Sequence, residues 1–363
     1  MNRCHVAADS VVLLSPDKLR ENLSGFPRLS LGIYPTPLQP AYGLSRELGR
    51  TVLVKREDLS GLAFGGNKVR HMELLMAEVR RAGADTVINV MDYHSNNARI
   101  AAAACVRAGL RYHVFLRHAA DRSIQGNCLL EHLLGAAVHL LNDDESQRGM
   151  EMARAVAKRL RSAGAVPYIM NDEIFPKIAG IISFAEAGIE LNEQLCAAGV
   201  SGPVRVVAVI GRSLCGLALT SLNLGLNWQF TGVRVTSSPS LFEYIFSHSE
   251  TVRDLIGLPR TYAAEDFDIV DCRANSDRPA HAVLEAVRLA ARTDGLMIDP
   301  NYTGVALTGL IERIKAGVVN QEETVVFVHT GGTPSIFNYA EELVPKSDRA
   351  LTPDAVHCLC LID

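Results

Sequence analysis

Short apolar segments alternate along the chain with longer segments whose apolar positions recur every three or four residues. Short apolar runs between turn residues are typical of buried strands, and the longer repeat is typical of amphipathic helices. Residues 68–81 show the helical repeat, with Val69, Met72 and Val79 on one face before Gly83. The pattern predicts strands at residues 51–54, 86–90, 112–116, 137–141, 166–170, 204–210, 231–237 and 324–329.

Helices are predicted between these strands, and several of them stop at a glycine, the residue that most readily ends a helix. Residues 1–36 are expected to be irregular, because Pro16 and Pro27 interrupt any continuous element. A long helix is expected after Pro176. The other predicted helices span residues 68–81, 96–107, 126–134, 145–162, 216–226, 240–256, 280–292 and 307–316.

Repeated strand–helix units require parallel sheets, because each helix returns the chain to the same end of the sheet. We therefore predict an α/β fold with two parallel-sheet domains and a cleft between them. The large domain is expected to comprise residues 1–70 and 176–363, and the small inserted domain residues 71–175. No linker rich in Pro, Gly or Ser marks these boundaries.

Composition narrows the class of protein. The 363 residues are 48% hydrophobic and 21% charged with a net charge of −4, which is ordinary for a globular protein. Without a basic run, neither nucleic acid nor an anionic membrane is an expected partner. The eight cysteines form no Cys-x-x-Cys pair and the eleven histidines no metal motif, so free thiols and no metal site are expected. The N-terminus carries no long apolar run, which favours a cytoplasmic protein.

One loop delivers a lysine to the start of a helix, in the sequence Gly65-Gly66-Asn67-Lys68. It is not a phosphate-binding loop of the Walker type, because Asn67 interrupts the required Gly-Lys pair. The positive end of the helix would lower the pKa of Lys68 and favour the neutral amine that forms an imine. A lysine at the surface of a helix is the structural alternative.

Three more loops follow predicted strands, where ligands bind in open parallel sheets. Ser95 and Asn96 suit a carboxylate site, although helix capping alone would explain them. Residues 211–216 place two glycines around amides that could face a phosphate, and an ordinary strand-to-helix turn is equally compatible. Residues 329–334 form a Thr-Gly-Gly-Thr turn that permits close approach to a flat ligand. Upstream lies Tyr302, which turn chemistry does not explain.

The order of these motifs resembles that of the 1-aminocyclopropane-1-carboxylate deaminase and D-cysteine desulfhydrase family. The resemblance spans residues 34 to 340, and its most specific segments are Gly-Gly-Asn-Lys and His-Thr-Gly-Gly. The supporting segments are residues 34–38, 55–61, 95–99 and 299–304. It implies a pyridoxal-phosphate enzyme of fold type II, with the cofactor in the cleft between the two domains.

The resemblance also implies roles for single residues. Lys68 would hold the cofactor as an internal aldimine, and Ser95 and Asn96 would face the substrate carboxylate and the ring oxygen of the cofactor. Tyr302 would take part in substrate activation, with a pKa lowered by the cationic imine. Thr330 would lie at the pyridine nitrogen.

The sequence departs from the family pattern most in the phosphate loop, which is usually rich in glycine. Here it has Gly211, Arg212, Ser213, Leu214, Cys215 and Gly216. We expect it still to bind phosphate, through Ser213 and the amides of residues 214–216, with Arg212 as a further contact. Val305 replaces the usual lysine after the tyrosine motif, and Asn97 replaces a histidine or glutamine.

These observations predict a lyase or deaminase that depends on pyridoxal 5'-phosphate and acts on a small amino acid resembling D-cysteine or aminocyclopropane carboxylate. A homodimer is expected from the family. Two alternatives stay open because of the altered loop: an enzyme of β-replacement or other biosynthetic chemistry on the same fold, and a binding protein that has lost turnover.

Overall fold

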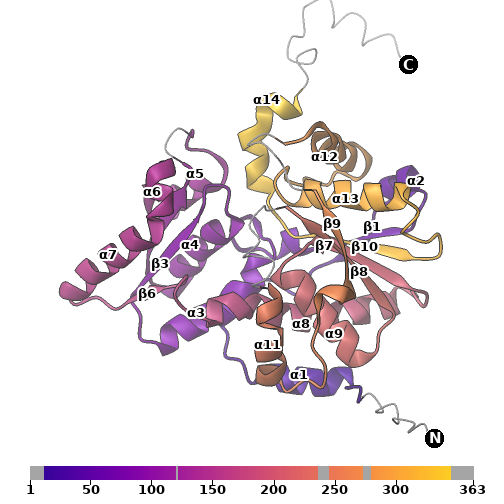
Figure 1. The fold of residues 1–363 in the computed structure, drawn as a ribbon, viewed down its shortest axis with the longest axis horizontal. Coiled ribbons are helices and arrows are strands. Elements are labelled where there is room, and N and C mark those ends of the chain that lie inside the picture. Colours follow the sequence, from indigo (N-terminus) through magenta and orange to yellow (C-terminus); the bar gives the residue numbers. More distant parts are fainter. Residues whose placement is uncertain (1–11, 120–121, 236–244, 273–278, 345–363) are drawn as a thin grey trace, which may run out of the picture.

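Two β-sheets, each covered by helices on both faces, form two lobes in the computed structural model (Figure 1). The structure describes residues 12–119, 122–235, 245–272 and 279–344. One sheet has the strand order β1-β2-β10-β7-β8-β9, and the other has the order β5-β4-β3-β6. All pairings are parallel except that of β1 with β2. The predicted α/β class with two parallel sheets is therefore confirmed, with one antiparallel edge strand added.

The six-stranded sheet has the buried strand β10 near its centre, between β2 and β7. Helices α1, α8, α9 and α11 cover one face, and α2, α12 and α13 cover the other (Figure 1). The strands are β1 (Leu38–Pro40), β2 (Val52–Arg56), β7 (Val204–Val209), β8 (Trp228–Arg234), β9 (Phe267–Asp271) and β10 (Thr324–His329). The helices are α1 (Pro16–Ser24), α2 (Tyr42–Leu48), α8 (Phe175–Ala197), α9 (Arg212–Leu224), α11 (Ser249–Ile256), α12 (His281–Asp294), α13 (Thr303–Lys315) and α14 (Ala340–Leu343).

The four-stranded sheet belongs to the smaller lobe. Helices α3, α4 and α5 cover one of its faces, and α6 and α7 lie over the other (Figure 1). Its strands are β3 (Thr86–Asp92), β4 (Arg111–Arg117), β5 (Ala137–Leu140) and β6 (Pro167–Ile169). The helices are α3 (Lys68–Arg81), α4 (Asn96–Ala108), α5 (Gly126–Leu133), α6 (Asp143–Gln147) and α7 (Gly149–Ser162).

Helix α3 belongs to both lobes. Its residues Val69 and Met72 pack into the core of the smaller lobe, whereas Leu74 packs into the core of the larger one. His71 also makes an edge contact with Phe184 of α8, with 5.8 Å between the ring centres. The expected domain boundary after residue 70 falls inside this continuous helix. Lys68, the first residue of α3, therefore lies where the two lobes meet.

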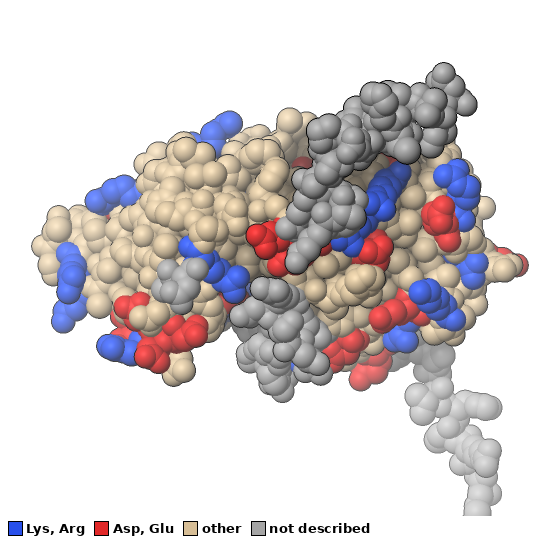
Figure 2. Space-filling view, turned by 90° about the horizontal axis from the view of Figure 1, so that it is seen from above, with Lys and Arg blue, Asp and Glu red and all other residues tan. Residues whose placement is uncertain are grey.

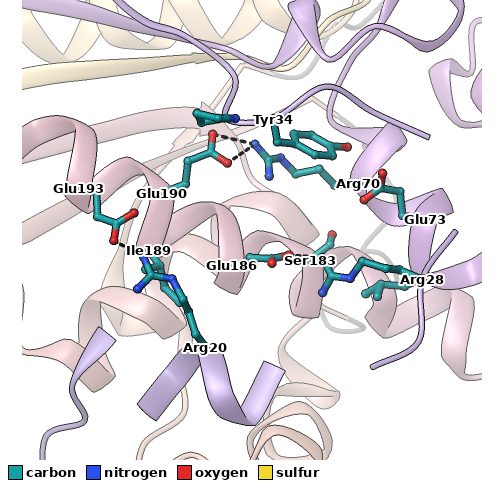
Figure 3. Close-up of a pocket in the computed structure, with 12 residues that line it drawn as sticks. Arg20, Arg28, Tyr34, Arg70, Glu73, Ser183, Glu186, Ile189, Glu190 and Glu193 are labelled. Atoms are coloured by element: carbon teal, nitrogen blue, oxygen red, sulfur yellow. Dashed lines mark hydrogen bonds and ion pairs between the residues drawn. The ribbon is translucent and has the colours of Figure 1, made fainter. Parts of the chain in front are cut away.

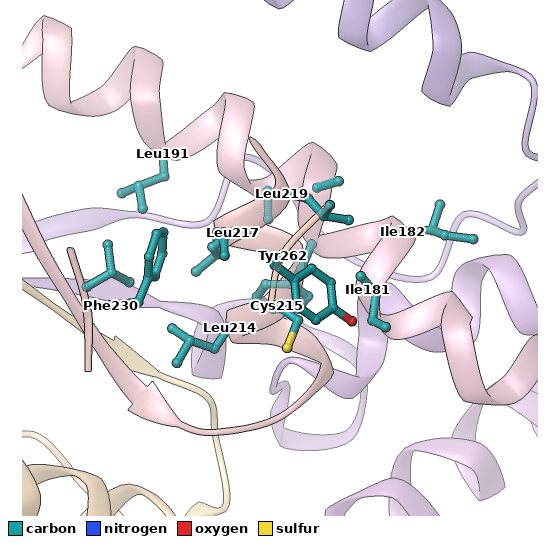
Figure 4. Close-up of a cluster of buried hydrophobic side chains, with 14 of the residues drawn as sticks. Ile181, Ile182, Leu191, Leu214, Cys215, Leu217, Leu219, Phe230 and Tyr262 are labelled. Atoms are coloured by element: carbon teal, nitrogen blue, oxygen red, sulfur yellow. The ribbon is translucent and has the colours of Figure 1, made fainter. Parts of the chain in front are cut away.

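Helices α8 and α9 pack tightly against each other in the larger lobe. A β-carbon at Gly216 would lie 2.4 Å from the carbonyl oxygen of Ile181, so α9 can approach α8 closely only with glycine there. Leu214 and Cys215 are fully buried beside this contact and point into the cluster shown in Figure 4, with Tyr262 next to Cys215. The first turns of α9 therefore serve the core as well as the loop that precedes them.

Some predicted elements were wrong at their ends. Residues 1–36 are not irregular throughout, because α1 begins at Pro16, whose fixed backbone suits the first turn of a helix, and Ser15 caps it by accepting from the amide of Lys18 at 3.1 Å. The predicted helix 145–162 is two helices that meet at Arg148. Helix α9 begins at Arg212, four residues before the predicted start. Strands β1 and β9 were missed. Parts of the elements predicted at 231–237 and 240–256 lie outside the described residues.

The surface is of mixed charge. Lys and Arg alternate with Asp and Glu over the face shown in Figure 2, and neither sign dominates its coloured residues. No helix in the described ranges is long and apolar enough to span a bilayer. The five cysteines that the structure describes are all free thiols.

Candidate active site

The lysine loop leaves β2 and reaches α3 through two short 3₁₀ turns, η1 (Glu57–Leu59) and η2 (Leu62–Phe64). Ala63 and Phe64 have positive φ angles of 43° and 67°, which are strained for residues with a side chain. Gly65 is required by space, because a β-carbon there would lie 2.1 Å from the carbonyl oxygen of Asp58. The loop is therefore a tightly constrained approach to Lys68.

This loop packs backbone against backbone on the Thr-Gly-Gly turn after β10. The amide of Asn67 donates to the carbonyl of Thr330 at 2.9 Å. A β-carbon at Gly331 would lie 2.7 Å from the Cα atom of Gly66, and one at Gly332 would lie 2.4 Å from a carboxylate oxygen of Asp299. The structure thus brings together the loops of Lys68, Thr330 and Tyr302, as the sequence analysis required of a single site.

The amine of Lys68 has an unusual pKa. Burial and, to a smaller extent, the positive charge of Arg212 lower this pKa to about 7. The side chain remains partly accessible. A large fraction of the amine is therefore neutral at physiological pH, as a nucleophile requires. The sequence predicted a lower pKa because of the positive helix end, whereas burial is its largest cause in the structure.

The first turn of α9 faces Lys68. Its N-terminus has no side-chain cap, so the first amides, those of residues 212–214, have no acceptor within the helix. The amide of Cys215 instead donates to the carbonyl of Gly211 at 3.1 Å. Ser213 accepts from Nδ2 of Asn67 at 2.8 Å, which joins this turn to the lysine loop. Nε of Arg212 is buried without a partner among the described residues. Such a turn is suited to binding an anion.

Ser95 and Asn96 open helix α4 beside this region. The hydroxyl oxygen of Ser95 accepts from the amide of Ala98 at 3.2 Å, so Ser95 is an N-cap, and its hydroxyl hydrogen remains able to donate. Asn96 accepts from Nδ2 of Asn127 through its side-chain oxygen at 2.9 Å. The capping role anticipated from the sequence is therefore present and leaves donor groups available for a ligand.

Tyr302 is held by a buried carboxylate. Oxygens of Asp299 accept from the amides of Asn301, Tyr302 and Thr303, each at 3.0 Å. Burial and then the charges of Asp299 and Asp92 raise the pKa of the Tyr302 phenol above its usual value. Burial is the largest cause of this shift, and the lowering expected beside a cationic imine stays a prediction for the cofactor-bound enzyme. Tyr302 is therefore a neutral hydrogen-bond donor.

Residues that the sequence analysis did not select also connect the two lobes here. The Tyr339 hydroxyl bonds the side-chain oxygen of Asn301 at 2.6 Å and lies 3.3 Å from Nε2 of His94. The rings of His94 and Tyr339 are stacked, with their centres 5.6 Å apart. His94 precedes Ser95, and its place in the loop after β3 was the signal in the sequence that could have identified it.

A separate cavity of about 310 Å³ lies between α1, α3 and α8 (Figure 3). Lys68 does not line it. Its three arginines are paired: Arg70 bonds Glu190 at 3.0 Å, Arg28 bonds Glu186 at 2.6 Å, and Arg20 pairs with Glu193. The remaining carboxylate of the lining, that of Glu73, accepts from the backbone amides of Leu31 and Gly32 at 2.9 Å each. The convergence of loops around Lys68 is the better candidate for the active site.

A family model described as pyridoxal-phosphate dependent enzyme matches residues 29–331. The chain belongs to this family. It is 34% identical over 330 residues to a protein of Pyrococcus abyssi assigned as a 1-aminocyclopropane-1-carboxylate deaminase, covering 89% of this chain and 96% of the relative. It is 31% identical over 337 residues to the D-cysteine desulfhydrase of Salmonella choleraesuis, covering 88% and 98%. A crystal structure of an ACC deaminase homologue superposes with a TM-score of 0.80 at 27% identity, covering 91% of this chain and 99% of the other.

These findings confirm the family predicted from the motifs and, with it, pyridoxal phosphate as the cofactor of this enzyme. The residues present fit that cofactor. A lysine with a pKa of about 7 suits an aldehyde, and three amides beside the partly buried Arg212 suit a phosphate.

Proposed function

We propose that this enzyme deaminates a small amino acid by elimination, with D-cysteine-like or aminocyclopropane-like substrates as the best candidates. The observation that supports this most directly is Lys68, whose amine has a pKa of about 7 where the lysine loop contacts the Thr330 turn and the first turn of α9. The names of the relatives from Pyrococcus abyssi and Salmonella choleraesuis support the substrate class.

Bound pyridoxal phosphate would supply the electron-withdrawing group that weakens the bonds at the α-carbon of an amino acid. Lys68 would anchor it and, once free, take the proton from the α-carbon with its neutral amine. The hydroxyl of Ser95 and the amide group of Asn96 would hold the substrate carboxylate and the ring oxygen. The neutral hydroxyl of Thr330 would face the pyridine nitrogen without offering it a compensating charge.

The phosphate would be held by the amides of residues 212–214, the hydroxyl of Ser213 and the guanidinium of Arg212. Two residues named from the sequence would act differently. The amide of Cys215 is already bonded to Gly211, and Gly216 lies where α9 contacts α8. The start of the helix would thus be shaped by Gly211, Leu214, Cys215 and Gly216. Of these four residues, Leu214 alone would contact the phosphate, through its amide.

Tyr302 would donate a proton or a hydrogen bond to the departing or accepting atom of the substrate. Its raised pKa keeps the phenol protonated, which suits an acid rather than a base. Tyr302→Phe removes only the hydroxyl, so we expect cofactor binding to persist while turnover falls by about 10²–10⁴-fold. Turnover and unfolding midpoint measured on the same preparations would separate this role from packing. Unchanged turnover would contradict it.

Borohydride reduction of the cofactor-loaded enzyme, followed by peptide mapping, tests the anchor. The label should appear on Lys68 and vanish in Lys68→Ala. Lys55 is an internal control, because its ammonium is buried and bonded to the carbonyl of Thr36 and to Gln194 at 2.8 and 2.7 Å. A label on Lys55 or Lys177 would overturn the assignment.

An amino-acid panel scored for ammonia and 2-keto acid tests the reaction. Release of both products supports elimination with deamination. A new amino acid formed from an added nucleophile would indicate β-replacement, and labelled Lys68 without turnover of any substrate would indicate a binding protein. Sedimentation of the same sample would test the proposed homodimer.

A further inference from the structure

Arg99 is a fully buried arginine of α4 whose side chain leaves its own helix and reaches the lysine loop. Its two terminal nitrogens donate to carbonyl oxygens of that loop, Nη1 to Ala63 and Nη2 to Gly65 at 3.2 Å. Its Nε donates to the side-chain oxygen of Asn127 at 2.8 Å. One planar group thus holds three acceptors from two different segments, which a single ammonium could not do.

Asn127 continues this connection to the loop that carries the carboxylate-binding candidates. Its Nδ2 donates to the carbonyl of His94 at 3.1 Å and to the side-chain oxygen of Asn96 at 2.9 Å. Asn127 is 2% exposed at the start of α5. The preceding Gly126 permits close contact with the larger lobe, because a β-carbon there would lie 2.1 Å from the side-chain oxygen of Asn338.

The segment that Arg99 holds is the strained one. Ala63 and Phe64 both have positive φ, a conformation that costs free energy and persists only where the surroundings enforce it. The guanidinium bonds the carbonyls on either side of Phe64, with charge-assisted hydrogen bonds. Without these bonds the loop would relax toward ordinary backbone angles and carry Lys68 with it.

A nearby carboxylate shows that this arrangement is not the simplest way to satisfy a buried arginine. Glu131 is also fully buried, and its charge acts on Arg99. Yet neither of its carboxylate oxygens bonds any residue in the described part of the chain. The guanidinium donates its hydrogen bonds to the lysine loop and to Asn127 rather than to Glu131.

We propose that Arg99 and Asn127 are positioning residues that fix the lysine loop and the 94–96 loop relative to each other, so that Lys68 and the carboxylate site of Ser95 and Asn96 act on one substrate. The roles of Lys68, Ser95 and Asn96 in this statement rest on the proposed function. The hydrogen-bonded link itself does not.

The test is hydrogen exchange on the full-length protein, with and without pyridoxal phosphate, in Arg99→Met and Arg99→Lys. We expect amides of residues 61–67 to exchange at least about 10-fold faster in Arg99→Met, with little change at residues 74–81 in the later turns of α3. Arg99→Lys should show a smaller effect, because it keeps the charge and loses the planar fork. Ile100→Ala, a buried neighbour that bonds neither loop, is the matched control.

Borohydride labelling of the cofactor-loaded enzyme supplies a second measurement, which a general loss of stability would not change. The fraction of cofactor fixed to Lys68 by borohydride should fall several-fold in Arg99→Met, partly recover in Arg99→Lys, and stay unchanged in Ile100→Ala. Equal changes in Ile100→Ala, or unchanged exchange at residues 61–67 in Arg99→Met, would overturn the proposal.

Asn127→Asp keeps the test decisive should Arg99→Met fail to fold. An aspartate retains an oxygen for Nε of Arg99 but loses the donor to His94 and Asn96. It should accelerate exchange at residues 92–97 and leave residues 61–67 protected; the reverse pattern would refute the link. If the wild-type enzyme shows no cofactor on Lys68, the proposed function fails, while the exchange results still decide whether the two loops are coupled.

Discussion

At the scale of single residues, burial shifts the pKa values of ionisable groups in and near the site. Lys68 is pushed toward the neutral amine by burial and by Arg212. Glu131 is pushed toward the neutral acid by burial alone, since its pKa rises to about 8 against the weaker opposing effect of Arg99. Both shifts follow from the same cost of burying a charge, and each gives a measurable dependence on pH.

Replacing Arg212 with Met should raise the pKa of Lys68, because a neighbouring positive charge is removed. The rate at which apo-protein attaches pyridoxal should then follow a pH profile displaced to higher pH. Affinity for pyridoxal phosphate should fall about tenfold or more, roughly 1.4 kcal/mol, whereas affinity for pyridoxal should change little. Arg107→Met, an exposed arginine of α4, is the control. Parallel loss of both ligands would contradict a phosphate contact.

Replacing Glu131 with Gln should remove a dependence of stability on pH. Because the folded pKa of about 8 lies above the ordinary 4.5, the native state binds the proton more tightly. The stability that the Glu131 proton contributes is fully present below the ordinary pKa of 4.5 and is lost as pH rises through the folded pKa of about 8. Each pKa unit corresponds to about 1.4 kcal/mol, so the loss is up to several kcal/mol. Urea unfolding at pH 6 and pH 9 should show a smaller difference in Glu131→Gln than in wild type.

At the scale of elements, the sequence pattern predicted most strands and helices, but it misplaced some of their ends, including the start of α9 at the candidate phosphate site. Helix α1 was missed because Pro16 was interpreted as a breaker although it stands in the first turn of a helix. The start of α9 was placed late, because Gly211 and Gly216 looked like the two ends of one loop. Only the contact with α8 shows that Gly216 serves packing, and no local pattern encodes that contact. The motif segments did predict which loops converge, whereas Arg99 and Asn127 were missed because their partners are distant in sequence.

The contact between α8 and α9 makes a prediction that differs from a ligand-binding role for Gly216. In Gly216→Val the added side chain meets backbone of α8 at 2.4 Å, so the helices must separate. We expect a loss of about 1–3 kcal/mol or more in the free energy of unfolding, typical of overpacking. Leu214→Ala should cost about 2–5 kcal/mol through lost core packing. Denaturant titrations of the apo-proteins would measure both, and normal apo-stability with weak cofactor binding in Gly216→Val would favour a phosphate role.

At the scale of the whole molecule, buried charges attach α3 to the larger lobe. Arg70 of α3 bonds Glu57 at 2.8 Å and Glu190 of α8 at 3.0 Å, and Lys55 of β2 pairs with the same Glu190. Arg70 also stacks on the Tyr34 ring at 4.1 Å. This network joins the N-terminal segment, the sheet and two helices around the first turns of α3 (Figure 3).

Glu190→Gln should therefore be strongly destabilising, because it leaves Lys55 and Arg70 buried with less compensating charge. Breaking a buried pair in this way typically costs about 3–5 kcal/mol. Glu193→Gln, three residues later in α8, removes an exposed partner of Arg20 and should cost about 0–1 kcal/mol. Unfolding free energies of the two variants, measured side by side, provide the comparison, and equal costs would show that the network adds nothing beyond a surface pair.

Helix α3 packs into the cores of both lobes, and Lys68 is its first residue. We expect any rotation of one lobe against the other to take place about this shared helix, because it is fixed in both cores, and residues on a rotation axis move least. Such a rotation would separate the loops of His94 and Tyr339 while Lys68 keeps its place. The enzyme could then exchange substrate and product without loosening its hold on the cofactor.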